Sequence, residues 1–208
     1  MDRAAQSDNS LLAAWVAGSP DAGNELIERH FLLVHRFFHN KVGVGLDDLV
    51  QQTFLGCFEA AHRYEERASF KTFLLAIARN QLYRHYRQQR NQRLDFSSRS
   101  ARDLGASPTG ATAQREMERL LLQALQRIPL EAQVILELLY WEDMSTAEIG
   151  TVLEVPVNTV YSRLHRARQS LRRVLAELAP DVEVPLGGAE QDPACQNNHR
   201  AHRSDRRT

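Results

Sequence analysis

The sequence has few cysteines, no long apolar segment and no net charge, and each shortage excludes a class of protein. Only Cys57 and Cys195 occur in 208 residues, too few and too far apart for a disulfide-stapled secreted scaffold. The apolar runs are far shorter than the roughly 20 residues that a membrane-spanning helix needs. The polar start MDRAAQSDNS is not followed by the apolar stretch of a secretory signal. We therefore expect a soluble, cytoplasmic protein.

The neutral total charge conceals two strongly basic windows. With 26 basic and 26 acidic residues, the chain does not resemble a protein that coats nucleic acid non-specifically. Residues 79–93 and 155–173, however, each contain five arginines and no acidic residue. A solvated helix face usually mixes both signs, so these windows predict two separate contacts with anionic partners. The arginines are Arg79, Arg84, Arg87, Arg90 and Arg93 in the first window and Arg163, Arg166, Arg168, Arg172 and Arg173 in the second.

Apolar residues recur at spacings of three and four along most of the chain, which predicts helices, and no strand pattern is visible. Residues 93–114 are rich in Ser, Gly, Pro and Ala and keep no apolar period, which is typical of a linker. Residues 180–208 likewise predict a disordered tail. We therefore expect an all-α fold of two helical bundles, residues 1–92 and 115–179, joined by a flexible linker.

A helix-turn-helix is predicted near the C-terminal end. Ser145 and Glu148 form a capping box that starts a short helix, residues 153–155 make a turn, and Pro156 fits the entry to a second helix. In that helix one face is apolar, with Val160, Leu164, Ala167, Leu171 and Val174.

The opposite face of the second helix has the residue types that read a DNA major groove. Arginine can bind guanine O6 and N7 together, while Ser and Thr take phosphates. The candidate DNA-binding residues are Asn158, Thr159, Tyr161, Ser162, Arg163, His165 and Arg166. The alternative is a helical hairpin whose outer face is merely solvated.

Residues 125–129 (LQRIP) through Ile149, followed by 155–168 (VPVNTVYSRLHRAR), resemble region 4 of sigma factors in the extracytoplasmic function (ECF) group of the sigma-70 family. The resemblance implies that this helix-turn-helix reads the −35 promoter element. Two residues depart from the family pattern: Asn158 replaces a usual Gly, and Tyr161 replaces a common Lys or Arg.

Residues 47–55 (DDLVQQTFL) are similar to region 2.2 of the same family, which docks on the clamp helices of the RNA polymerase β′ subunit. The resemblance implies that Asp47, Asp48, Gln51 and Phe54 bind core polymerase. The alternative for Asp47 and Asp48 is a capping role, because carboxylates are favoured at a helix N-terminus.

Tyr64 and residues 70–80 (FKTFLLAIARN) resemble regions 2.3 and 2.4, which capture the unpaired non-template strand of the −10 element. That task needs a basic track, aromatic side chains and a pocket for an extruded base. The implied −10 residues are Tyr64, Phe70, Lys71, Arg79, Asn80, Tyr83, Arg84 and Arg87. Phe58 and Phe73 stand where the family commonly has Trp, and we expect buried rings at both. Arg84 stands where Asp is frequent.

Other constellations favour no enzyme, metal or cofactor. Cys195, His199 and His202 in the tail could offer three metal ligands, but they lie in Pro- and Gly-rich sequence without paired ligands at a standard spacing. The sequence assembles neither a catalytic triad nor a glycine-rich phosphate loop at a known spacing.

The sequence therefore predicts a sigma factor without catalytic activity. The expected partners are core RNA polymerase, through its β′ clamp helices and β flap, promoter DNA, and an anti-sigma factor. One alternative is a stand-alone DNA-binding regulator whose N-terminal bundle dimerises or senses a signal. A second is a recombinase with a helix-turn-helix tail, which would need a nucleophilic Ser or Tyr among clustered arginines.

Overall fold

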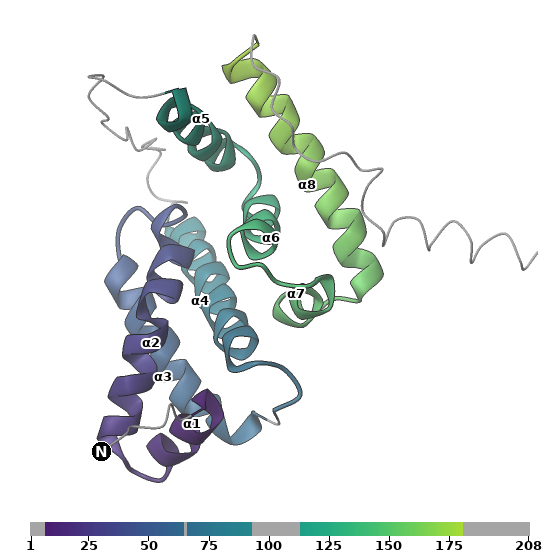
Figure 1. Cartoon of the computed structure of the whole chain (residues 1–208). Coiled ribbons are helices and arrows are strands. Elements are labelled where there is room, and N and C mark those ends of the chain that lie inside the picture. Colours follow the sequence, from purple (N-terminus) through teal and green to yellow (C-terminus); the bar gives the residue numbers. More distant parts are fainter. Residues whose placement is uncertain (1–6, 65, 93–112, 181–208) are drawn as a thin grey trace, which may run out of the picture. The chain divides into compact units, whose positions relative to one another are not determined.

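The computed structural model describes residues 7–64, 66–92 and 113–180, and these residues form helices and no strand (Figure 1). The expected all-α fold is thereby confirmed for this part of the chain. The predicted linker core and tail lie outside the described residues, and so do Cys195, His199 and His202.

A serine N-cap starts each of the first two helices of the N-terminal bundle. In α1 (Asp8–Val16) the N-cap Ser7 accepts a hydrogen bond from the backbone N–H of Ser10, and in α2 (Pro20–His39) Ser19 accepts one from Ala22. The indole of Trp15 lies directly over Gly23 of α2, where a β-carbon would come within 2.5 Å of its Nε1. A glycine is therefore required for α1 to approach α2 this closely.

Helices α3 (Leu46–Ala60) and α4 (Phe70–Gln92) complete this bundle, with the short 3₁₀ helix η1 (Ala61–Arg63) after α3. Gly45, at φ 83°, supplies the left-handed residue from which α3 starts. Helix α2 packs on α1, α3 and α4, and α3 packs on α4. The core consists largely of side chains from their facing sides: Leu11, Leu26, Val34, Phe38, Cys57, Leu74, Leu75 and Leu82 are all at most 1% exposed.

The remaining helices are α5 (Ala113–Arg127), α6 (Leu130–Tyr140), α7 (Thr146–Leu153) and α8 (Val157–Leu178). Both α5 and α6 pack against α8. The five predicted apolar positions of α8 are all buried, which confirms that face. Helix α7 begins directly after Ser145, as the capping box predicts.

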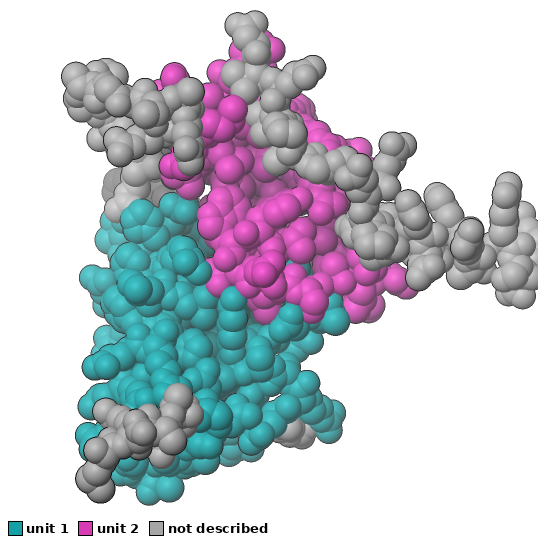
Figure 2. Space-filling view, viewed as in Figure 1, with its two compact units in different colours: residues 1–107, 147–154 teal, residues 108–146, 155–208 magenta. Residues whose placement is uncertain are grey.

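The chain separates into two compact units (Figure 2). One unit contains residues 1–107 together with 147–154, and the other contains residues 108–146 together with 155–208. The domain boundaries read from the sequence stay a prediction.

Candidate nucleic-acid interface

The turn before α8 is built from residues with restricted backbones. Glu154 adopts φ 55°, in the left-handed region, and the chain then extends through Pro156 at φ −59° and ψ 148°. Proline suits this entry because its missing N–H would have no helical partner there. The Thr146 hydroxyl donates to the Tyr161 hydroxyl of α8 over 3.2 Å, and both residues belong to the same unit.

One side of α8 is polar and exposed along its first turns. Asn158, Ser162, His165 and Arg166 are exposed and follow one another at intervals of four, three and one, so they share a face opposite the buried apolar residues. The other three predicted residues, Thr159, Tyr161 and Arg163, are half-buried on its flanks. The predicted −35 residues therefore all lie in the N-terminal half of α8.

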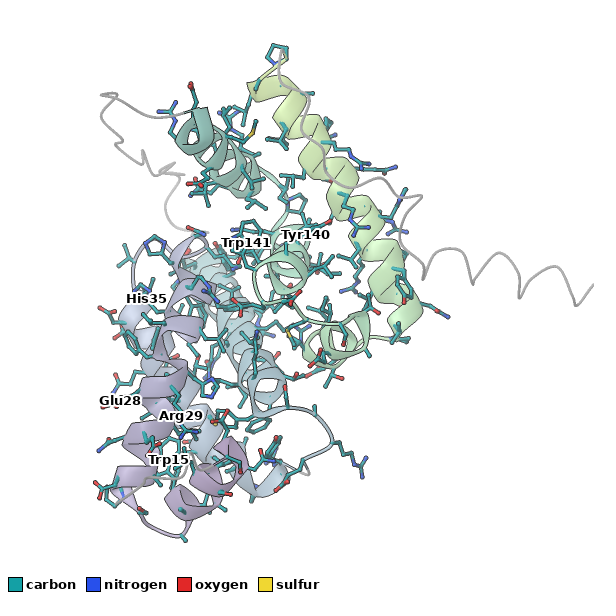
Figure 3. The ribbon with its side chains drawn as sticks, viewed as in Figure 1. Trp15, Glu28, Arg29, His35, Tyr140 and Trp141 are labelled. Carbon is teal, nitrogen blue, oxygen red and sulfur yellow. The ribbon has the colours of Figure 1, made fainter. Side chains whose placement is uncertain are left out.

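Arg168 differs from the other arginines of its window. Its Nε donates to the Tyr140 hydroxyl over 3.0 Å, and the guanidinium lies 5.8 Å from the centre of that ring. Tyr140 ends α6 and precedes the exposed Trp141 (Figure 3). Arg168 thus joins α8 to α6 within their unit, a role that the sequence window did not distinguish from DNA contact.

Four aromatic rings gather where the chain enters α4. Tyr64 stacks on Phe73 with ring centres 4.8 Å apart at 30°, and Phe70 meets both rings at 6.4 Å. The ring of His30 on α2 lies 5.0 Å from that of Phe70. Phe70 is 3% exposed, whereas Tyr64 and Phe73 are half-buried.

The structure corrects the expectations for three phenylalanines. Phe70, which we expected to contact DNA, lies in the core and supports the rings above it, while Phe73, which we expected in the core, reaches the surface. We expected a buried ring at Phe58 as well, but its side chain is 41% exposed. It packs beside Trp15, with ring centres 5.0 Å apart. Helical spacing alone marked all three as apolar positions without ranking their burial.

Four arginines of the first window, Arg79, Arg84, Arg87 and Arg90, lie on α4, and Arg93 lies outside the described residues. The guanidinium of Arg79 lies 5.0 Å from the centre of the Tyr83 ring and its Nη1 donates to Asn80 Oδ1 over 3.0 Å. Arg84 and Arg87 are exposed on the following turns, and Lys71 is half-buried near the start of the helix. The predicted −10 residues of α4 therefore extend over about five turns of one helix.

Helix α3 presents an exposed face with carboxylates, amides and apolar side chains. Asp47, Asp48 and Gln51 are exposed, as expected for a docking face. Phe54 is only 5% exposed and belongs to the core, so its expected contact with polymerase conflicts with its position. Leu55, 55% exposed, lies one turn after Gln51 and two turns after Asp48, and the sequence analysis missed it.

A polar pocket of about 290 Å³ continues this face onto α4. It is lined by Gln52, Leu55, Gly56, Glu59, Gln81, Arg84 and Gln88. Its amide, carboxylate and guanidinium groups suit polar side chains of a protein partner better than an apolar ligand.

Burial shifts the pKa of three titratable groups near these surfaces. It raises the pKa of the Tyr64 hydroxyl, assisted by the negative charges of Glu66 and Asp8, so this hydroxyl stays a hydrogen-bond donor at neutral pH. Burial also raises the pKa of the Cys57 thiol to about 12, which removes its nucleophilicity at neutral pH. The pKa of His85 is lowered by burial, which favours its neutral form.

Metal-ligand groups and membrane-spanning helices are both absent among the described residues. Across residues 7–64, 66–92 and 113–180 no group of three or more His, Cys, Asp or Glu side chains is arranged to hold a metal ion. None of the helices in those ranges is long and apolar enough to cross a membrane.

The chain matches two models of the same protein family. Sigma-70 region 2 matches residues 26–92, which contain most of α2 and all of α3 and α4, and Sigma-70 region 4 matches residues 118–171, which include α7 and most of α8. The residues named for the three surfaces, on α8, α4 and α3, therefore lie within the matched segments.

Relatives and a solved structure agree with these matches. RNA polymerase sigma factor CarQ of Myxococcus xanthus is 31% identical over 167 residues, which cover 79% of this chain and 95% of CarQ. ECF RNA polymerase sigma factor SigM of Mycobacterium tuberculosis is 29% identical over 191 residues, which cover 86% of this chain and 90% of SigM.

The fold resembles that of the sigma factor RpoE of Bartonella quintana, solved in complex with the anti-sigma factor NepR. The TM-score is 0.60 at 18% identity, over 73% of this chain and 95% of RpoE. Both matched regions and the similarity to CarQ over nearly its whole length lead to one conclusion. The chain belongs to the sigma-70 family, in its ECF group, and is an RNA polymerase sigma factor that directs promoter-specific transcription.

Proposed function

We propose that this sigma factor reads the −35 duplex with the exposed side of α8. The observation that carries the proposal is the division of this helix into a buried apolar face and an exposed polar one. Asn158, Ser162, His165 and Arg166 would face the major groove, with Arg166 able to bind a guanine through two hydrogen bonds. Thr159, Tyr161 and Arg163 would contact the groove from the flanks. The hydrogen bond from Thr146 would fix the direction of the Tyr161 side chain.

Capture of the melted −10 strand is assigned to the chain from Tyr64 to Arg87. Tyr64 and Phe73 offer a stacked aromatic surface at the entry to α4, and aromatic side chains bind bases through stacking. Lys71, Arg79, Arg84 and Arg87 would follow the phosphates, and Asn80 and Tyr83 would complete the polar track. Phe70 would act indirectly, by supporting Tyr64 and Phe73 from the core.

Docking on the β′ clamp helices of core polymerase is assigned to the exposed face of α3. Asp47, Asp48 and Gln51 would pair with polar or basic side chains, and Leu55 would supply the apolar contact that the sequence had assigned to Phe54. Interfaces of this kind combine an apolar centre with a polar rim. The unit that contains α8 would meet the β flap.

Regulation by an anti-sigma factor is a further part of the proposal. RpoE of Bartonella quintana forms such a complex, and this chain has a similar fold. We also infer that the protein acts in the cytoplasm, that core polymerase performs all the chemistry, and that the domains follow the boundaries predicted from the sequence.

Co-elution with core RNA polymerase tests the docking assignment. Wild-type protein mixed with sigma-free bacterial core enzyme should elute with it at one-to-one stoichiometry. The double variant Asp48→Ala/Gln51→Ala should lose this co-elution while it keeps its helical circular dichroism. Asn24→Ala, on an exposed position of α2, serves as the control and should co-elute like wild type. Full co-elution of the double variant would refute the assignment of this face.

A further inference from the structure

The first turn of α1 makes polar contacts with two different parts of its unit. Asp8 accepts from Arg29 Nη1 over 3.0 Å, and its other oxygen lies 2.8 Å from His30 Nε2, so α1 is fixed to α2. Asn9 contacts Tyr64 and Glu66, more than 50 residues further along the chain. Helix α1 precedes the segment matched by the region 2 model, which starts at residue 26.

The side chain of Asn9 bridges two residues that precede α4. Its Nδ2 donates to Glu66 Oε2 over 2.9 Å, and its Oδ1 lies 3.0 Å from the Tyr64 hydroxyl. That hydroxyl also lies 2.8 Å from the carbonyl oxygen of Ala68. Since a phenol has one proton, Tyr64 can donate fully to only one of these acceptors at a time. Asn9 therefore influences where the Tyr64 ring stands.

The backbone of Glu66 requires support from outside its own segment. Its φ is 56°, in the left-handed region that costs a residue with a β-carbon about 1–2 kcal/mol. Such conformations persist where surrounding contacts hold them. The amide of Asn9 provides one such contact because it holds the Glu66 carboxylate from a different helix.

The two anchors of α1 are connected through the aromatic cluster. His30, which pairs with Asp8, packs on Phe70, and Phe70 lies under Tyr64 and Phe73. Arg29, the other partner of Asp8, is labelled beside α1 in Figure 3. Helix α1 is thus linked to these aromatic rings twice, through the contact of Asp8 with His30 and through the contact of Asn9 with Tyr64.

We infer that Asn9 is a positioning residue for −10 strand capture, which makes α1 a part of the promoter-melting apparatus. Asn9 holds Tyr64 and Glu66 so that the Tyr64–Phe73 stack is ready to receive an unpaired base. This inference rests on the proposed role of Tyr64 in the −10 strand, and it adds a residue outside the matched family region.

Exchanging the hydrogen-bonding groups of the Asn9–Glu66 pair separates a loss of Tyr64 positioning from a general loss of protein stability. Asn9→Asp should place two carboxylates about 3 Å apart and repel Glu66, while an acidic residue in the first turn of α1 is itself favourable. Glu66→Gln should be mild, because a glutamine oxygen can still accept from Asn9. In the double variant Asn9→Asp/Glu66→Gln the hydrogen bond is restored in the reverse direction, because the amide at position 66 can donate to the carboxylate at position 9. Asn24→Asp on α2 is the matched control.

The measurement uses holoenzyme assembled with core polymerase and two probes selected from random DNA pools by wild-type holoenzyme. One probe is a single strand that carries the −10 element and the other is a −35 duplex. Asn9→Asp should weaken binding of the single strand about three- to tenfold, the effect of about one hydrogen bond. The double variant should recover wild-type affinity. All variants should bind the −35 duplex equally.

The outcomes distinguish this inference from the proposal on which it rests. If wild-type holoenzyme selects no single strand, the −10 assignment itself fails. If it selects one and Asn9→Asp binds it as tightly as wild type, or more tightly, the positioning role of Asn9 is overturned. A loss that the double variant does not recover also overturns it, because the defect would then come from somewhere other than the Asn9–Glu66 pair.

Discussion

Adjacent residues of this protein have opposite environments, and the assignment of function depends on that difference. Phe54 is buried and Leu55 exposed on α3, although either is apolar enough for a core or for an interface. Successive residues of a helix point about 100° apart, so one step along the chain moves a side chain from the core to the solvent. Phe70 and Phe73 lie three positions apart on α4, yet Phe70 is buried and Phe73 is half-buried. At the edge of a buried stripe, a step of three positions is therefore enough to change the exposure of a side chain.

This difference predicts opposite phenotypes for neighbouring substitutions on α3. Phe54→Ala should lower the free energy of unfolding by about 3–5 kcal/mol, because it empties a core position. Leu55→Ala should change stability by no more than about 0.5 kcal/mol but weaken binding to core polymerase. Denaturant titration and co-elution measure the two effects separately. Unchanged core binding by Leu55→Ala would remove this residue from the docking face.

Two exposed arginines of α8, Arg166 and Arg173, are expected to contribute to DNA binding in different ways. Arg166→Ala should weaken binding to the selected −35 duplex by about 1–3 kcal/mol, the usual contribution of a bidentate base contact. Arg173, exposed two turns further along the helix, provides the comparison. Arg173→Ala should lower the affinity equally for selected and scrambled duplexes. Fluorescence anisotropy with both duplexes tests this, and an equal loss for both with Arg166→Ala would argue against base reading.

At the scale of elements, the contact between α1 and α2 depends on the absence of one side chain. A β-carbon on Gly23 would lie 2.5 Å from Trp15 Nε1, within the indole rather than beside a flexible chain end. The helix interior would otherwise favour alanine over glycine by about 1 kcal/mol. Packing therefore opposes helix propensity at this position.

We predict that packing prevails. Gly23→Ala should lower the free energy of unfolding by about 1–3 kcal/mol, the usual cost of overfilling a packed site, and it should shift the Trp15 fluorescence because the indole must move. Asn24 lies next to Gly23 on the exposed side of α2. Asn24→Ala raises the helix propensity without a clash with Trp15, so it should leave the stability unchanged or raise it. A stabilised Gly23→Ala protein would show that the indole relocates at no cost.

At the scale of the molecule, the described arginines of the two windows belong to different units, those of the first window on α4 and those of the second on α8. If each window serves its own promoter element, the two DNA contacts can be weakened one at a time. Under the proposed assignments, promoter recognition would then be divided between the two units.

Variants of one arginine from each window test this division. Arg87→Ala should weaken binding of the selected −10 single strand by holoenzyme. It should also reduce the dependence of log K on log salt by about 0.7 for each phosphate that Arg87 neutralises in the wild-type complex. Its binding to the −35 duplex should remain unchanged, and Arg166→Ala should show the reverse pattern. Equal losses on both probes for either variant would contradict the division.

The helices, the all-α class and the family could be predicted from the sequence by itself, because each depends on local signals. The buried face of α8 follows from the spacing of five apolar residues, and the start of α7 follows from Ser145. These features need only helix geometry and the hydrogen-bonding groups of nearby residues.

Only the tertiary structure decided which of several apolar residues are buried and which distant residues meet. Spacing marked Phe54, Phe70 and Phe73 as apolar positions of helices, but the edge of each buried stripe is set by the neighbouring helix. The bridge from Asn9 to Tyr64 and Glu66 had no signal in the sequence at all. Such a contact exists because folding brings α1 beside the start of α4, and no local rule relates residues that lie 55 positions apart.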